Sequence, residues 1–211
     1  MKNIKAYIPK NWQLWVNIYI FINLALYGLW SGYNTWLEDQ LDFVEVSFMV
    51  QNILMLGFIL IRIEHKSLNK NVFHQVVALF AFFSGVAFMG QEPSGGEVAN
   101  AVSSWVIFFA NILGAVALLN LGKSFGILIA LRKVKTGGVY GIVRHPMYGA
   151  DILLRIGFVI SHFNTFTVLL FIVSAGAYVA RASYEEKFLS QEPEYREYMK
   201  NVRYRFIPYV Y

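Results

Sequence analysis

The stretch AVSSWVIFFANILGAVALLNLG, residues 101–122, carries no charged side chain over its whole length. A helix needs about 20 predominantly apolar residues to cross the hydrocarbon core of a bilayer, so this segment is long enough to span it. Similar apolar windows lie at residues 12–32, 44–63 and 72–90. The four windows predict an integral membrane protein that is built from helices.

A fifth apolar block runs from Ala150 to Ala182 and is too long for one ordinary membrane helix. The polar stretch SHFNTF at residues 161–166 favours a turn near its middle. We therefore expect a helical hairpin with arms at 150–162 and 166–189. The predicted fold class is all-α, a polytopic transmembrane helical bundle of four spans plus this C-terminal hairpin, with about five to six membrane helices.

The composition agrees with this interpretation, because 57% of the residues are hydrophobic and only 15% are charged. Residues 1–211 are expected to form a single integral membrane domain, with N-terminal transmembrane helices over 1–117 and the cofactor-binding and catalytic region, with a cytoplasmic tail, over 118–211. Cysteine is absent, which excludes disulfides, thiolate metal sites and cysteine nucleophiles. His74 has no second ligand at a suitable spacing, and no metal site is expected.

The charges indicate the topology. Every lysine and arginine except Arg155 precedes the first window, follows the second or the fourth, or lies beyond residue 180. The connections on the other side carry acidic residues instead, namely Glu38, Asp39, Asp42, Glu45, Glu92 and Glu97. The positive-inside rule places both termini and the loop at 123–149 in the cytoplasm. The net charge of +5 is thereby explained by topology, and nucleic acid is not expected as a partner.

The polar stretch GGVYGIVRHPMYGAD, residues 137–151, precedes the first arm of the hairpin. Pro146 disfavours a helical conformation at His145 and suits the first position of a helix. Arg144, His145 and a helix amino terminus then face the same place, which is a setting for an anion or a polar cofactor. The alternative is an arginine that reaches the headgroups and a histidine that caps the turn.

Two adjacent carboxylates lie near the end of the second arm, in RASYEEKFL at 181–189. Neighbouring residues on a helix point about 100° apart, so Glu185 and Glu186 are expected to have different roles. Glu185 is spaced to pair with Arg181, which leaves Glu186 free to face a site near His145. The alternative is a solvated helix end.

Asp151 and Arg155 lie four residues apart at the start of the first arm. Charges at this depth are usually paired or functional, so they predict a structural ion pair or a contact with substrate. In the tail, a helix is expected to begin at Glu192-Pro193, with tyrosines at 195 and 198 among basic residues. This helix is expected to lie on the anionic leaflet or to act as a lid over a pocket.

Five pieces of sequence in this order resemble one family: LGKSFG (121–126), VKTGGVYGIVRHPMY (134–148), RASYEEKFL (181–189), EYREY (194–198) and RFIP (205–208). The chain from about residue 118 to 208 is similar to the integral-membrane methyltransferases that include isoprenylcysteine carboxyl methyltransferase and the phospholipid N-methyltransferases. The resemblance implies that S-adenosyl-L-methionine binds at the cytoplasmic side and that the acceptor arrives from the bilayer. The implied cofactor-binding residues are Gly138, Tyr140, His145, Pro146, Tyr148, Gly149 and Glu186. The implied catalytic residues are Arg144, which would orient an acceptor carboxylate or phosphate, and Glu185, a candidate base for an amine acceptor.

The predicted function is a membrane-embedded methyltransferase that uses S-adenosyl-L-methionine. Its acceptor is a membrane lipid or a lipophilic small molecule: an isoprenylcysteine-like carboxylate, a phospholipid amine or a small thiol. Asp151 and Arg155 depart from the apolar pattern expected there and are candidates for substrate binding. No feature indicates an obligate protein partner. The alternatives are an NADPH-dependent membrane reductase of the sterol or steroid type and a small membrane protein without enzymatic activity.

Overall fold

The computed structural model describes Ile22, Leu29, Tyr33 and residues 42–88, 91 and 93–210. The expected first span, 12–32, therefore lies outside the described residues except for Ile22 and Leu29, which are helical. The described α-helices are α2 (Phe43–Ile61), α3 (Val72–Phe83), α4 (Glu97–Leu121), α5 (Pro146–Ser161), α6 (Thr165–Leu189) and α7 (Pro193–Asn201). Short 3-10 helices are η2 (Ser84–Phe88), η3 (Gly122–Ser124) and η4 (Gly138–Gly141), and the strands are β1 (Ser67–Leu68) and β2 (Ala130–Leu131).

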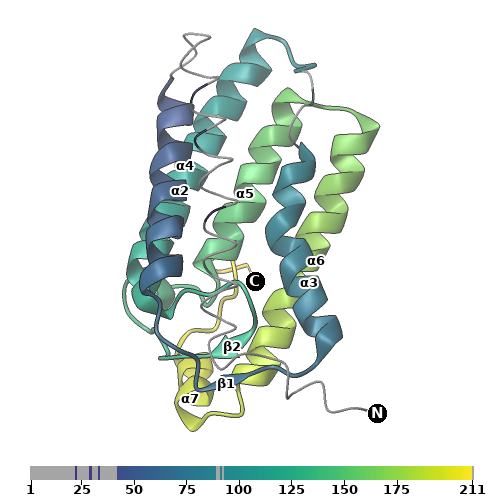
Figure 1. The fold of residues 1–211 in the computed structure, drawn as a ribbon. Coiled ribbons are helices and arrows are strands. Elements are labelled where there is room, and N and C mark those ends of the chain that lie inside the picture. The colour runs from purple at the N-terminus through teal and green to yellow at the C-terminus, as the bar shows by residue number, and fades with distance from the viewer. Residues whose placement is uncertain are drawn as a thin grey trace, which may run out of the picture.

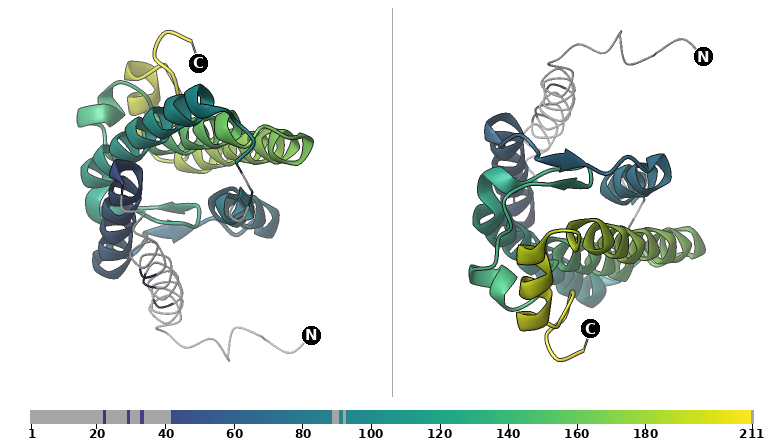
Figure 2. Two further views of the ribbon diagram at one scale, coloured as in Figure 1. Left: turned by 90° about the horizontal axis from the view of Figure 1, so that it is seen from above. Right: turned by 90° about the horizontal axis from the view of Figure 1, so that it is seen from below.

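The long helices lie side by side and run alternately up and down (Figure 1). Helix α4 packs against both α2 and α5, while α6 packs against α3 and α5. The two short strands form an antiparallel pair, with Ser67 opposite Leu131, and lie between α2 and α3 when the bundle is viewed along its helices (Figure 2). The predicted all-α helical bundle is confirmed for the part of the chain that is described.

Three of the described helical segments are long and apolar enough to cross a membrane: Phe43–Ile61, Glu97–Ser124 and Thr165–Leu189. The segment Val72–Phe88 is apolar but shorter, because α3 ends at Phe83 and continues only as the 3-10 helix η2. Large apolar side chains such as Ile53, Phe109 and Ile172 are exposed on these helices. Contiguous exposed apolar surface of this kind is typical of helices that face lipid.

The predicted hairpin is present as α5 and α6. Helix α5 begins at Pro146, a few residues before the predicted arm, because a proline at the first helical position needs no partner for a backbone N–H group. The turn ends at Asn164, whose side chain accepts a hydrogen bond from the Thr167 N–H at 3.0 Å. Thr167 reciprocates by accepting from the Asn164 N–H at 3.2 Å, so a capping box starts α6.

Polar contacts join the helices inside the bundle. Asn111 on α4 donates to the Ser47 hydroxyl on α2 at 2.8 Å, as expected of a lone asparagine in a membrane span. Ser103 on α4 donates to the Gly157 carbonyl on α5 at 2.7 Å. Gly157 also lets α5 approach α4 closely, because a Cβ atom there would lie 2.7 Å from Ile107. These contacts fix α5 against α4 and so position the turn that precedes α5.

The two ends of the bundle differ in charge. The strands, the loop that follows α4 and helix α7 gather at one end (Figure 1), and the lysines and arginines of residues 123–144 and 187–205 lie in or next to these segments. Asp42, Glu45 and Glu97 lie at the starts of α2 and α4, at the opposite end. This separation agrees with the predicted topology, in which the basic end faces the cytoplasm.

Candidate functional site

The RHPMYG turn is held against the C-terminal tail. Arg144 and His145 donate their backbone N–H groups to the carbonyls of Tyr204 and Arg205, at 2.9 and 2.8 Å. The Arg144 guanidinium also donates to the carbonyls of Val202 and Arg203, at 2.8 and 2.7 Å. His145 has φ −129° and ψ 59°, outside the helical region, as predicted for a residue before proline. The turn and the tail therefore form one unit.

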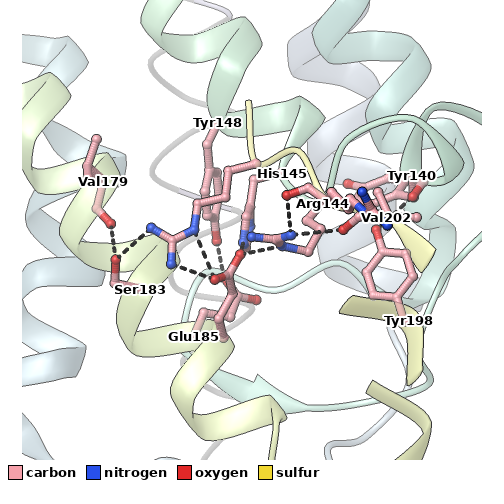
Figure 3. Close-up of polar contacts among 12 residues, drawn as sticks. Tyr140, Arg144, His145, Tyr148, Val179, Ser183, Glu185, Tyr198 and Val202 are labelled. Atoms are coloured by element: carbon pink, nitrogen blue, oxygen red, sulfur yellow. Dashed lines mark hydrogen bonds and ion pairs between the residues drawn. The ribbon is translucent and has the colours of Figure 1, made fainter. Parts of the chain in front are cut away.

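Glu186 is the centre of a buried cluster of charges at this unit, and Figure 3 shows its partners Arg144 and His145 close to each other. Its Oε1 atom accepts from Arg144 Nε at 2.7 Å and lies 3.0 Å from His145 Nε2. Its Oε2 atom contacts Arg205 Nη2 at 2.8 Å. Glu186 is only 3% exposed. The predicted proximity of Glu186 to His145 is confirmed, but the expectation that Glu186 is free is wrong, because both of its oxygens are engaged.

Glu185 takes the place that was expected of Glu186. The Tyr148 hydroxyl donates to Glu185 Oε2 at 2.5 Å. The predicted pair of Glu185 with Arg181 is replaced, since Arg181 donates to the carbonyls of Ala78 and Ile127 at 2.9 and 2.7 Å. Its guanidinium lies 4.8 Å from the centre of the Tyr148 ring. Arg181 is buried against main-chain oxygens that need donors, and Glu185 is left to face the cavity.

A cavity opens beside this cluster at the basic end of the bundle. It contains about 760 Å³ of space free of protein atoms, counting the open solvent at its mouth. Of the predicted site residues, Tyr140, Arg144, His145, Tyr148 and Glu185 line it. The other lining residues are Leu121, Ser124, Phe125, Gly126, Leu128, Ala130, Leu131, Arg132, Lys133, Val134, Lys135, Met147, Leu189, Tyr195 and Tyr198.

Three further residues that the resemblance implied, Gly138, Pro146 and Gly149, do not line the cavity but fix the course of the backbone near it. Gly138 has φ 60°, and a Cβ atom there would overlap the Asn120 side chain. A Cβ atom at Gly149 would lie 3.2 Å from the Phe206 carbonyl. Pro146 starts α5. Each has a structural reason for its identity, and a direct cofactor contact at these positions stays a prediction.

Helix α7 forms one wall of the cavity. Its two tyrosines, Tyr195 and Tyr198, are buried, and the Tyr198 hydroxyl donates to the Tyr140 carbonyl at 2.7 Å. Burial, together with the nearby charge of Glu185, raises the pKa of Tyr140 far above its usual range, so its hydroxyl keeps its proton. Of the two predicted roles for this helix, the contacts favour a cover over the pocket, because its tyrosines pack on protein.

Asp151 and Arg155 do not line the cavity. The Asp151 carboxylate accepts from the Tyr178 hydroxyl at 2.9 Å, and Arg155 donates to the Asp151 main-chain carbonyl at 2.8 Å. Arg155 also donates to the Ser84 hydroxyl at 3.2 Å and lies 4.9 Å from the centre of the Tyr178 ring. The expected side-chain pair is thus replaced by a set of contacts that joins α5 to η2 and α6. A role for these residues in substrate binding stays a prediction.

The sequence pattern did not single out several of the lining residues. Ser124, Arg132, Lys133 and Lys135 lie between α4 and η4, where the basic residues were attributed to topology alone. The pairing of β2 with β1 brings this loop under the hairpin. No local sequence pattern predicts a pairing of two-residue strands. The position of these residues in the cavity wall therefore becomes apparent only from the fold.

The chemistry of the lining suits a polar, partly cationic small molecule. Cationic side chains attract a carboxylate, Glu185 suits an amine or hydroxyl groups, and four tyrosines add aromatic surface to the wall, namely Tyr140, Tyr148, Tyr195 and Tyr198. Among the described residues, no group of three or more histidine, aspartate or glutamate side chains could hold a metal ion. The donor set therefore fits S-adenosyl-L-methionine, which carries a carboxylate, an amine, ribose hydroxyls and a sulfonium.

Two comparisons relate the chain to known proteins. Residues 113–195 match the family model described as phospholipid methyltransferase. The chain is also 33% identical over 105 residues to protein-S-isoprenylcysteine O-methyltransferase B of Arabidopsis thaliana. That alignment covers 46% of this chain and 53% of the plant protein, so the chain spans about half the length of the curated relative it matches. Both findings confirm the resemblance to the membrane methyltransferases.

Proposed function

We propose that the protein is a methyltransferase that binds S-adenosyl-L-methionine in the cavity at the basic end of the bundle. The observation that carries this proposal is the meeting of the RHPMYG turn with the Glu185-Glu186 pair around one cavity. These segments are about 40 residues apart, and both lie within the residues that match the phospholipid methyltransferase model. The plant protein that is 33% identical to this chain over 105 residues is named an O-methyltransferase.

When bound, the cofactor supplies an electrophilic methyl group that is transferred by in-line displacement at carbon. The protein then has to bind the two reactants, orient them and exclude water, because such a displacement needs no covalent intermediate with the enzyme. Tyr148 is fixed by its bond to Glu185, and its ring is stacked on the His145 ring at 5.1 Å. The Arg181 guanidinium also lies over this ring, so the Tyr148 hydroxyl and the Glu185 carboxylate beside it, rather than the ring face, suit the polar groups of the cofactor.

Glu186 would act on the cofactor through other residues. It fixes Arg144 and His145 from the side away from the cavity and ties Arg205 of the tail to them. In this assignment Glu185 takes the direct contact with the cofactor that the sequence suggested for Glu186. For an amine acceptor Glu185 is also the candidate base, since it is a carboxylate in the cavity wall.

The acceptor is proposed to be a lipophilic or membrane-partitioning molecule. The cavity lies where α4 and α6 end and α5 begins, with Leu121, Leu128 and Met147 in its wall. A carboxylate or phosphate on the acceptor would be oriented by Arg144, which also lines the cavity. By the positive-inside rule the site would face the cytoplasm, where the cofactor enters from water and the acceptor from the bilayer.

Calorimetric titration of the detergent-purified protein with S-adenosylmethionine, S-adenosylhomocysteine and NADPH tests the proposal. We expect saturable binding of the first two, with dissociation constants of about 1–100 μM, as is usual for enzyme ligands. Binding of NADPH alone would replace the proposal by the reductase alternative. A protein that binds none of the three would have no cofactor site of the proposed kind.

A further inference from the structure

Two polar side chains in the cavity wall have no role in the contacts described above. Ser124 is the last residue of η3, and Arg132 directly follows β2. Both line the cavity, and both are buried, at 9% and 8% exposure. Among the residues that the structure describes, Ser124 Oγ and Arg132 Nε have no hydrogen-bond partner. Buried polar atoms without a hydrogen-bond partner are rare and cost free energy. A ligand that binds in the cavity would supply the partner that each of these two atoms lacks.

The backbone makes room for the Arg132 guanidinium beside the cavity. A Cβ atom at Gly126, another lining residue, would overlap this guanidinium, so the glycine leaves room for the guanidinium in the position that it takes here. Gly126 and Ser124 belong to the same LGKSFG segment. A serine hydroxyl, an arginine and a glycine therefore come together where the loop after α4 meets the residues after β2.

The surrounding charges favour an anion. Lys133, Lys135 and Arg144 line the same cavity, and Glu185 is the one carboxylate among its lining residues. Burial and the like charge of Arg132 lower the pKa of Arg62 to about 10. Burial also lowers the pKa of Arg132, which the charge of Glu185 partly offsets. A bound negative charge would reduce the repulsion between these partly buried cations.

We propose that Ser124 and Arg132 form an anion subsite that binds a carboxylate of a ligand held in the cavity. This inference rests on the proposed function. A guanidinium matches a carboxylate with two parallel N–H donors, and a serine hydroxyl adds a third donor. The carboxylate comes from the amino-acid part of the cofactor, whose amine then faces Glu185, or from the acceptor.

The test compares two nucleosides that differ in this group. S-adenosylhomocysteine carries the amino acid, while 5′-methylthioadenosine lacks both its carboxylate and its amine. We expect Arg132→Gln to weaken binding of S-adenosylhomocysteine by about 10- to 100-fold, the usual value of a hydrogen bond to a charged group, and to leave binding of 5′-methylthioadenosine unchanged. Ser124→Ala should show the same selectivity with a loss of about 3- to 10-fold. Lys66→Gln is the matched control, because Lys66 is an exposed cation beside β1 that does not line the cavity.

The other outcomes are distinct. If Arg132→Gln leaves both nucleosides unaffected but selectively raises the KM for N-acetyl-S-farnesylcysteine, the subsite holds the acceptor's carboxylate. If it changes neither binding nor that KM, the inference is overturned. An equal loss of affinity for both nucleosides also overturns it, because a carboxylate contact acts on only one of them. If the unaltered protein binds neither nucleoside, the proposed function itself fails.

Discussion

Replacing Glu186 by glutamine removes the charge at the centre of the cluster and keeps the size of the side chain. In the structure both carboxylate oxygens accept from cationic groups, Oε1 from Arg144 with His145 beside it, and Oε2 from Arg205. Glutamine has one oxygen and one NH₂ group, so in either orientation it points a donor at a donor. The side chains of Arg144 and His145 are only 9% and 7% exposed, so water compensates poorly for the lost partner.

We expect Glu186→Gln to lower the free energy of unfolding by about 2–4 kcal/mol, from the loss of charge-assisted bonds and the uncompensated burial of Arg144. For a chain of this size that corresponds to a fall of about 4–16 °C in the unfolding midpoint in detergent. The affinity for S-adenosylhomocysteine should also fall, because the tail that covers the cavity is released, and protease cleavage beyond residue 190 should be faster.

Glu197→Gln is the control for this experiment. Glu197 pairs with Lys200 on the surface, where their side chains are 64% and 73% exposed. Its loss should change the unfolding free energy by less than about 0.5 kcal/mol. If Glu186→Gln resembles this control in midpoint, affinity and cleavage rate, then the buried cluster does not hold the tail against the turn, and our interpretation of Glu186 is refuted.

Two further substitutions separate the roles of the turn residues. Tyr148→Phe removes the hydroxyl that fixes Glu185 and keeps the ring stacked on His145. We therefore expect the free energy of unfolding to fall by only about 1 kcal/mol but kcat to fall clearly. An unchanged kcat with the best acceptor would exclude a positioning role for the hydroxyl. Gly138→Ala forces a side chain into a left-handed conformation and against Asn120, which should cost about 1–3 kcal/mol in an unfolding assay. Gly137→Ala is its control, since Gly137 has φ −97° and open space around its Cα; equal stability losses in the two variants would contradict this explanation.

The hairpin shows how far local sequence reaches. Pro146 and Asn164 are signals that act within a few residues. The start of α5 was predicted to within four residues, and both ends of the turn between α5 and α6 to within one. The end of α3 at Phe83 was not predicted, because the window 72–90 predicted one apolar span although Ser84 and Gly85 interrupt it. The helix yields there to a 3-10 turn, where the Ser84 hydroxyl receives a hydrogen bond from Arg155 of α5.

The two glutamates show where local reasoning ends. Helical spacing correctly separated their roles, but it favoured a pair between Glu185 and Arg181, which are four residues apart. The carbonyls of Ala78 and Ile127 compete for that arginine, and they lie 103 and 54 residues away from it in the sequence. With Arg181 engaged there, Glu185 faces the cavity and Glu186 faces the turn. The choice between two adjacent carboxylates thus depends on distant main-chain acceptors.

The sequence by itself determined that the chain is a helical membrane protein, where most of its described helices lie, and which end carries the basic residues. These properties follow from length, hydropathy and residues near each helix end, all of which act locally. Only the tertiary structure decided which residues share the cavity. Arg132 reaches it through a strand pairing, Tyr198 through the docking of α7, and Glu185 through the engagement of Arg181. Each depends on contacts between segments that are far apart in the chain, and such contacts leave no pattern in a short stretch of sequence.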